Sequence, residues 1–263
     1  MKIFLLIFSC LIVTHSVIGQ NQDDYSPADD GKFLSDKIQN PIANLATLPI
    51  QYELITQSKN SNMVRLLPTI PVQLTNKWQL ITHADVPIAN MYTNRGYENG
   101  FGNIVLTATL TPTKETGTSW GVGPAIMFPS VNNELGFNNL SVGPSVTYLK
   151  QVKGFTYGLT VQNFFSVAGP STNPDVNYLQ TKLHFAKTLN NNWYVYTNPE
   201  ITANWNAKAS NQWRIPLGIG AGKLIEHSRY LPINVQAGVY KYVEHPTDAD
   251  WLVQVKAAFI LKK

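Results

Sequence analysis

The chain alternates apolar and polar side chains over most of its length, and the stretch WLVQVKAAFIL (251–261) shows the pattern clearly. Its odd positions, from Trp251 to Leu261, are all apolar, whereas its even positions include Gln254 and Lys256. Successive side chains of a β-strand point to opposite faces, so this alternation predicts a strand with one apolar and one partly polar face. The same period of two recurs from about residue 46 onward, and no helix-length pattern interrupts it.

The strands predicted by this pattern are about 10 to 14 residues long, the length that a tilted strand needs to cross a bilayer. Short connections such as TNK (75–77) and LNNN (189–192) alternate with longer ones such as NMYTNRGYENGFG (90–102) and PSVNNELGFNN (129–139). Short turns at one end and longer loops at the other are typical of an outer-membrane barrel. The twelve predicted strands span residues 46–57, 63–75, 78–89, 102–112, 119–129, 140–149, 155–167, 176–189, 193–205, 212–223, 231–242 and 251–261.

Large aromatic residues gather at the ends of these strands and share the apolar face. Such a placement predicts two girdles at the membrane interfaces. The alternative is a soluble core with tryptophans at both of its rims. The residues concerned are Trp78, Trp120, Phe155 and Trp193 beside short turns, and Trp205, Trp213 and Trp251 at the opposite ends.

The second face of the strands is polar but carries few charges, and the whole chain has only 14% charged residues against about 25% in an ordinary soluble domain. A barrel of about twelve strands is wide enough for an interior cavity or a narrow channel, so this face is expected to line a lumen. The side chains expected along the solute pathway are Glu53, Arg65, His83, Asp85, Tyr178, Lys182, His184, Tyr194, Tyr196, Glu200, Arg214 and Lys256. A lumen that these side chains simply fill is an equally open interpretation.

One hairpin can be placed in register from the sequence. If its turn is centred on Asn191, Lys182 faces Glu200 and His184 faces Asn198, with all four side chains inward. Seven prolines fall inside predicted strands, where each removes a ladder hydrogen bond and implies a bulge or an irregularity. They are Pro49, Pro68, Pro71, Pro124, Pro144, Pro199 and Pro216.

The N-terminal residues predict export. A basic start, the apolar run IFLLIFSCLIV and small residues near Gly19 predict a signal peptide over residues 1–19. Residues 20–44 form a polar segment in which 33–40 can make a short helix that plugs the lumen or lies below it. The barrel then occupies residues 45–263. Cys10 is the only cysteine, so the exported part has none.

The sequence offers only incomplete catalytic and metal-binding motifs. His83 and Asp85 share the inward face, but no serine can be matched to them as a nucleophile. His245 lies near Asp248 and Asp250, without a reliable spacing for a metal ligand set. The net charge is +4, and the basic residues are scattered. We therefore expect no enzyme activity, catalytic residue, cofactor, metal or nucleic-acid partner.

Several segments resemble a known family of bacterial outer-membrane barrels. They are QNPIANLATLPIQYE (39–53), NKWQLITHADVP (76–87), GFGNIVLTATLTP (100–112), WGVGPAIMFP (120–129) and WRIPLGIGAGKL (213–224). The family is often labelled "neuromedin U" or "transporter" and is similar to MetA-type channel proteins associated with phenol degradation. The resemblance runs from about residue 38 onward and implies an exported barrel with a transport function. Such chains usually finish on an aromatic residue, whereas Phe259 is the last aromatic here.

The sequence therefore predicts an all-β protein, a closed antiparallel up-and-down transmembrane β-barrel of about twelve strands. The function expected is a channel or transporter in the cell outer membrane for small, possibly aromatic, solutes. An outer-membrane enzyme acting on lipid and a structural barrel without transport are the alternatives. The expected partners are outer-membrane lipid, a small-molecule solute and the outer-membrane assembly machinery.

Overall fold

The structure is a computed structural model that describes residues 30–114, 117–131, 133–227 and 230–261. The chain divides into two units, Met1–Asp30 and Gly31–Lys263, and the second unit contains the β-structure described below. The predicted signal peptide and the polar stretch up to residue 29 lie outside the described residues, so both stay predictions. Among the described helices, none has the length and apolar character needed to cross a membrane.

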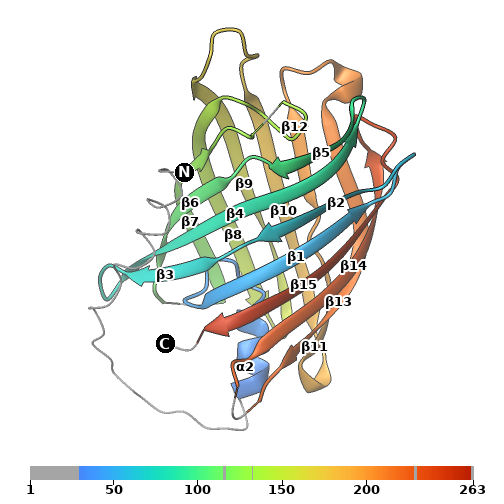
Figure 1. Cartoon of the computed structure of the whole chain (residues 1–263). Coiled ribbons are helices and arrows are strands. Elements are labelled where there is room, and N and C mark those ends of the chain that lie inside the picture. The colour runs from blue at the N-terminus through green and yellow to red at the C-terminus, as the bar shows by residue number, and fades with distance from the viewer. Residues whose placement is uncertain (1–29, 115–116, 132, 228–229, 262–263) are drawn as a thin grey trace. The chain divides into compact units, whose positions relative to one another are not determined.

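The strands pair side by side into a closed antiparallel ring, which Figure 1 shows as a barrel of tilted strands. The first strand pairs with the last, and β9 pairs with β10 to complete the ring. Three barrel strands are interrupted (β2/β3, β5/β6 and β11/β12), so fifteen segments make the twelve strands that the sequence predicts. The segments are β1 (Ala46–Ile55), β2 (Ser61–Leu66), β3 (Thr69–Gln73), β4 (Trp78–Thr93), β5 (Gly96–Phe101), β6 (Val105–Pro112), β7 (Thr118–Met127), β8 (Leu140–Val152), β9 (Phe155–Ala168), β10 (Asn177–Thr188), β11 (Trp193–Thr197), β12 (Glu200–Asn204), β13 (Trp213–Ile225), β14 (Ile233–Glu244) and β15 (Trp251–Leu261).

The alternation along each strand separates an exposed apolar outer face from an inner face that lines the lumen. On β15, Val255 is 48% exposed, whereas its neighbours Gln254 and Lys256 line the interior cavities. The predicted aromatic girdles also point outward, with Trp120, Trp193 and Trp251 each at least 40% exposed. In transmembrane barrels, lipid tails cover such an outer belt of exposed aliphatic and aromatic side chains.

One predicted loop is wrong for most of its length. Residues 90–102 were expected to form a long connection, but β4 runs to Thr93 and β5 returns from Gly96. Gly96 adopts a φ of 104°, which glycine tolerates without a steric penalty, and Tyr92 packs against Tyr97 with ring centroids 5.3 Å apart. The polar, glycine-rich composition therefore hides a hairpin that cross-strand aromatic packing stabilises.

Three of the in-strand prolines lie at the irregularities that the sequence predicts, two at strand breaks and one at a register shift. Pro68 lies in the break between β2 and β3, and Pro199 lies in the break between β11 and β12. Pro216 stands at a register shift between β13 and β14. At Pro49 and Pro71 the prediction is wrong for the ladders with β15 and β4, which continue without a shift.

The two remaining prolines face each other. Pro124 on β7 pairs with Pro144 on β8, so the repeated segments VGPAIMF and VGPSVTY lie side by side. The ladders on the two far sides of this strand pair are interrupted at the same level. The β6–β7 pairing is missing beside Gly123, and the β8–β9 pairing is missing beside Gly143. A Cβ at Gly143 would lie 1.6 Å from the Asn163 carbonyl oxygen, so only glycine allows the backbones to approach this closely.

The helix α2 (Asp30–Lys37) and the chain that follows it occupy the barrel end where the short turns lie (Figure 1). Gln151 Nε2 donates to the Asp36 carbonyl oxygen at 2.7 Å, and Asn40 Nδ2 donates to Ser119 Oγ at 2.9 Å. Ile42 and Ala43 are buried at 5% and 2% exposure. Of the two arrangements expected for residues 33–40, the contacts of Asp36 and Asn40 with inner-wall side chains favour the plug.

Candidate functional site

The lumen holds two cavities that follow one another along the barrel. The short-turn cavity has a volume of about 260 Å³ and is bordered by residues 38–43 at the end that carries the short turns. The loop-side vestibule has a volume of about 850 Å³ and is bordered by the connections 133–138 and 173–175. One set of side chains lines both and therefore separates them: Arg65, Asp85, Val105, Gln180, Glu200 and Gln254.

Arg65 holds this constriction together. Its Nε donates to Asp85 Oδ1 at 3.0 Å, and its Nη2 forms an ion pair with the same carboxylate. Its Nη1 lies 3.4 Å from Glu53 Oε1, and its Nη2 lies 3.3 Å from Glu200 Oε2. Glu200 stands on β12, across the ring from β2 in strand order, so the guanidinium bridges two walls of the lumen. The arrangement places three carboxylates around one cation. We call these four residues the Arg65 cluster.

A second cation shares Glu200. Lys182 Nζ lies 3.3 Å from Glu200 Oε2, and Gln180 Nε2 donates to Glu200 Oε1 at 2.7 Å. The register that sequence predicts is confirmed for this pair, because Lys182 stands directly opposite Glu200 in the β10–β12 ladder. Asn191 has a φ of 56° within the turn, as a two-strand reversal centred there requires. Lys182 therefore belongs to the same charge network as the constriction.

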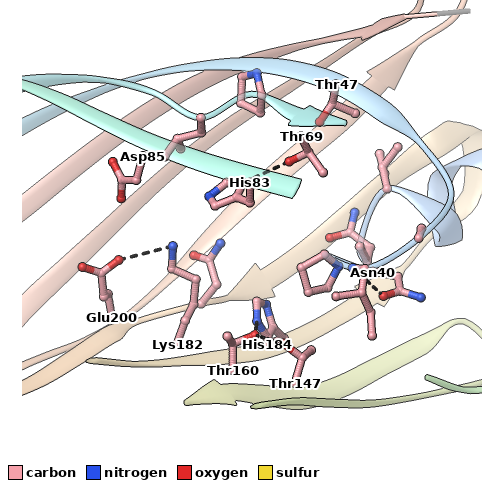
Figure 2. A pocket seen from close by; sticks show the side chains of 18 of the residues that line it. Asn40, Thr47, Thr69, His83, Asp85, Thr147, Thr160, Lys182, His184 and Glu200 are labelled. Atoms are coloured by element: carbon pink, nitrogen blue, oxygen red, sulfur yellow. Dashed lines mark hydrogen bonds and ion pairs between the residues drawn. The ribbon is translucent and has the colours of Figure 1, made fainter. Parts of the chain in front are cut away.

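Two histidines project into the short-turn cavity from opposite sides (Figure 2). His83 Nδ1 lies 3.0 Å from Thr69 Oγ1, and His184 Nε2 lies 3.1 Å from Thr160 Oγ1. Asp85 is bound to Arg65 and makes no hydrogen bond to His83 among the described residues. The pair therefore lacks the carboxylate–imidazole contact that a catalytic triad uses to orient its base.

Lys256 lines the same cavity. Its cross-strand neighbours are Gln51 on β1 and Gln236 on β14, so no acidic residue stands directly opposite it. Within the part of the chain that the structure describes, no carboxylate forms an ion pair with its ammonium group. The short-turn cavity thus combines amide and hydroxyl groups with one cation that has no counterion.

Three tyrosines belong to the lumen wall. Tyr194, Tyr196 and Tyr240 are 0%, 5% and 1% exposed. A Cβ built at Gly222 would lie 2.3 Å from Tyr194 Cζ, and one at Gly220 would lie 2.4 Å from Tyr196 Cζ. The rings therefore lie flat in the space that larger side chains on β13 would fill.

The polar tips of two of these tyrosines are satisfied inside the wall. Tyr194 Oη donates to Asn234 Oδ1 at 2.6 Å and accepts from Gln236 Nε2 at 2.7 Å. Tyr240 Oη donates to Asn198 Oδ1 at 2.8 Å. Because buried polar groups need such partners, these hydroxyls are occupied in stabilising the wall.

The loop-side vestibule is lined differently. Phe137, from the connection 129–139, packs edge to face on Tyr178 with ring centroids 5.0 Å apart. Asn103 fixes this loop, because its Oδ1 accepts from the Phe137 N–H at 2.8 Å and its Nδ2 donates to the Phe137 carbonyl at 2.6 Å. Arg214 and Tyr242 complete one side of the vestibule. The vestibule therefore combines aromatic and apolar groups with two guanidinium groups and five carboxylates: Arg65, Arg214, Glu53, Asp85, Glu134, Asp175 and Glu200.

The structure brings together eleven of the twelve predicted lumen residues, which line one or both cavities; Tyr194 lines neither. Their roles in a solute pathway stay predictions. Sequence reasoning missed Phe137, Met63 and Met91, which also line the vestibule. An aromatic residue inside a polar loop was the available signal for Phe137.

The three residues considered as a weak metal site have other partners. His245 Nδ1 accepts from the Thr247 N–H at 3.1 Å, and Asp248 Oδ2 accepts from the Ser58 N–H at 3.0 Å. Asp250 pairs with Lys241. Among the described residues, no group of three or more His, Cys, Asp or Glu side chains is arranged to hold a metal ion.

Comparison with known proteins identifies the fold. No protein-family model matches the chain, and no curated protein matches it. Among solved structures, it is similar to the COG4313 outer-membrane channel from Pseudomonas putida F1, with 14% identity and a TM-score of 0.63 over 90% of this chain and 100% of that one. It is also similar to the NanC porin, with 11% identity and a TM-score of 0.55 over 82% of this chain and 100% of that one. The fold is thus that of outer-membrane channel and porin barrels.

Proposed function

We propose that the protein is an outer-membrane channel or transporter for small solutes. The observation that carries the proposal is the pair of cavities, one behind the other, that meet at the Arg65 cluster. A solute enters the vestibule between the long connections, passes the constriction beside Gln180 and Gln254, and reaches the short-turn cavity. It leaves past residues 38–43. Rings of charged side chains at a constriction are a common basis of selectivity in channels.

Small aromatic solutes suit the vestibule, because Phe137 and Tyr178 present ring surfaces there. The resemblance to MetA-type channels of phenol degradation supports the same solute class. The two solved barrels with related folds support passage through the lumen, since one is named a channel and the other a porin. A barrel that the Arg65 cluster simply braces shut is the competing reading.

The compartment is tested first. The protein should fractionate with outer membranes, and unheated samples should migrate faster on a gel than boiled ones because the folded barrel stays compact. Recovery as a soluble periplasmic protein would contradict the proposal.

Transport is tested by conductance and by chemical block. The chain lacks cysteine outside position 10, so Gln180→Cys and Leu179→Cys each introduce one thiol outside that position. The two positions are neighbours on β10, and their side chains point to opposite faces of the strand. We expect steady conductance steps in planar bilayers, and a bulky methanethiosulfonate should reduce the current only in Gln180→Cys. Equal block of both variants would remove the constriction from the pathway. Silence together with lipid hydrolysis would favour the enzyme alternative.

A further inference from the structure

Two buried hydrogen-bond donors near the loop side of the lumen have no acceptor. Arg214 Nε and His245 Nε2 are both buried without a hydrogen-bond partner among the described residues. Arg214 stands on the inner face of β13, opposite Thr202, and lines the vestibule. His245 lies in the connection between β14 and β15 and packs edge to face on Tyr242, with ring centroids 4.5 Å apart. Each such donor in a native structure requires an explanation, and an absent ligand is one.

The imidazole of His245 is a donor at this atom. Its Nδ1 accepts from the Thr247 backbone N–H, so the proton of the neutral ring resides on Nε2. Burial, followed by the positive charge of Arg214, lowers the pKa of His245 to about 4, so the ring is neutral at pH 7. Tyr242, on which His245 packs, lines the vestibule together with Arg214.

The charge of Arg214 is uncompensated. No salt bridge joins it to any carboxylate in the part of the chain that the structure describes, whereas Arg65 has three. Arg214 is partly exposed and its Nε is buried, and a charge that is partly removed from water is costly unless it is paired. An anion from solution would remove this cost, and a carboxylate matches the fork geometry of a guanidinium.

The side chains around Arg214 indicate which chemical group accompanies the negative charge of the anion. The vestibule is lined by the rings of Phe137, Tyr178 and Tyr242 and by the side chains of Met63 and Met91. Its carboxylates are Glu53, Asp85, Glu134, Asp175 and Glu200, and the first two and the last of these are bound to Arg65. Asn103 holds Phe137 in place, because its side-chain amide accepts from the Phe137 N–H and donates to the Phe137 carbonyl oxygen. A volume of about 850 Å³ is ample for a single-ring molecule. Aromatic pairs prefer edge-to-face or offset contacts, which a flat solute can make with these rings.

We propose that the loop-side vestibule is a binding site for a small aromatic carboxylate, with Arg214 and His245 Nε2 receiving the carboxylate and Phe137, Tyr178 and Tyr242 receiving the ring. This proposal names a solute class for the proposed transport function, and it rests on that function. An aromatic acid that enters between the long connections meets this site before it meets the Arg65 cluster.

The test measures equilibrium binding of three probes to the full folded chain in detergent: benzoate, benzyl alcohol and cyclohexanecarboxylate. Wild type should bind benzoate more tightly than either other probe, because only benzoate offers both the charge and the aromatic ring. Arg214→Gln should weaken benzoate binding about ten- to a hundredfold, the range expected for loss of a charge-assisted hydrogen bond. Lys77→Gln removes one positive charge at an exposed short turn and should leave the affinity unchanged.

Three results would overturn the proposal. They are benzoate affinity that survives Arg214→Gln, benzyl alcohol that binds as tightly as benzoate, and an absence of benzoate binding to wild type. If Arg214→Gln does not fold, the ring-proton resonances of His245 in wild type decide, because they must shift on benzoate addition and not on benzyl alcohol addition. Conductance measured separately distinguishes the two proposals. Binding without conductance refutes only transport, and conductance without binding refutes only the site.

Discussion

Arg65 and Arg214 stand on the same inner surface in opposite electrostatic situations. Arg65 contacts three carboxylates, from β1, β4 and β12, and its side chain is 12% exposed. Arg214 has no carboxylate partner among the described residues, and its Nε is buried without an acceptor. A buried ion pair whose partners are all satisfied fixes the geometry of the groups around it. A partly buried cation that lacks a counterion is instead available to an anion that arrives from solution.

The contrast also divides the lumen by task. The constriction at Arg65 is held by fixed charges of the protein itself, so it resists change in width. The vestibule at Arg214 is held by aromatic packing and by the Asn103 contacts, and the charge of Arg214 has no carboxylate partner among the described residues. In the proposed channel, an anionic solute would therefore be attracted in the vestibule and discriminated at the constriction.

The largest expected effect comes from removing Arg65. Arg65→Gln leaves Glu53, Asp85 and Glu200 close together without their cation, and loss of one partner of a buried ion pair costs about 3–5 kcal/mol. Reversible urea unfolding in lipid vesicles measures the loss. Arg214→Gln is the matched control and should change the free energy of unfolding by less than about 1 kcal/mol in either direction, because it strands no carboxylate and removes an unpaired charge. Equal losses in the two variants would erase the distinction between a paired and an unpaired arginine.

A third arginine, placed on the other side of the wall, checks that both natural ones face the lumen. Val255 is 48% exposed on the outer face, and Lys256 follows it on the inner face. Val255→Arg should cost about 2–4 kcal/mol near the middle of the bilayer, whereas Lys256→Arg should cost little. The same unfolding measurement compares them. Equal stability of these two variants would mean that the faces are reversed.

Lys182 tests whether the fixed charges set ion preference. Because the Lys182–Glu200 pair contributes only about 0.2–1 kcal/mol as a cross-strand pair, Lys182→Glu should fold. The lumen becomes more negative, so the reversal potential under a salt gradient should move toward that of the cation. Lys77→Glu, at an exposed turn, is the control and should leave it in place. A conducting Lys182→Glu variant with an unchanged reversal potential would remove Lys182 from the pathway.

The smallest effect is the titration of His245. Burial and the charge of Arg214 lower its pKa to about 4, so nuclear magnetic resonance should find a midpoint there, and a higher one in Arg214→Gln. The unfolded chain binds this proton near pH 6.5, so the contribution of His245 to stability decreases as pH falls from about 6.5 to about 4. A wild-type midpoint near 6.5 would show that the ring is open to water and that the two donors are not neighbours.

Alternation of side chains made the barrel predictable. Apart from the hairpin at residues 90–102, each predicted strand coincides with an observed one to within a few residues. The reason is that the two faces of a barrel wall meet different environments, which imposes a period of two on the side chains. The prolines were harder to interpret. Pro49 and Pro71 remain in regular ladders with β15 and β4, since a proline affects only the side of the strand toward which its missing N–H would point.

Contacts between adjacent strands were predictable, and contacts across the lumen were not. A turn at Asn191 is enough to place Lys182 opposite Glu200. The contact between Arg65 and Glu200 depends on barrel width, strand tilt and side-chain length together, none of which a linear pattern specifies. The inward position of Phe137 depends on hydrogen bonds from Asn103, a residue 34 positions away in the chain.

Residues 36–40 have a consequence for the order of assembly. They precede β1 directly, and they bond to β7, β8 and β10 through Ser119, Gln151 and Thr188 at sequence separations of 79, 115 and 152. The seam between β1 and β15 joins the first strand made to the last one. None of these contacts involves β15, so they can form before the seam closes. Such a tether would hold an open sheet in a curve and would leave a defined gap in which β15 forms the seam.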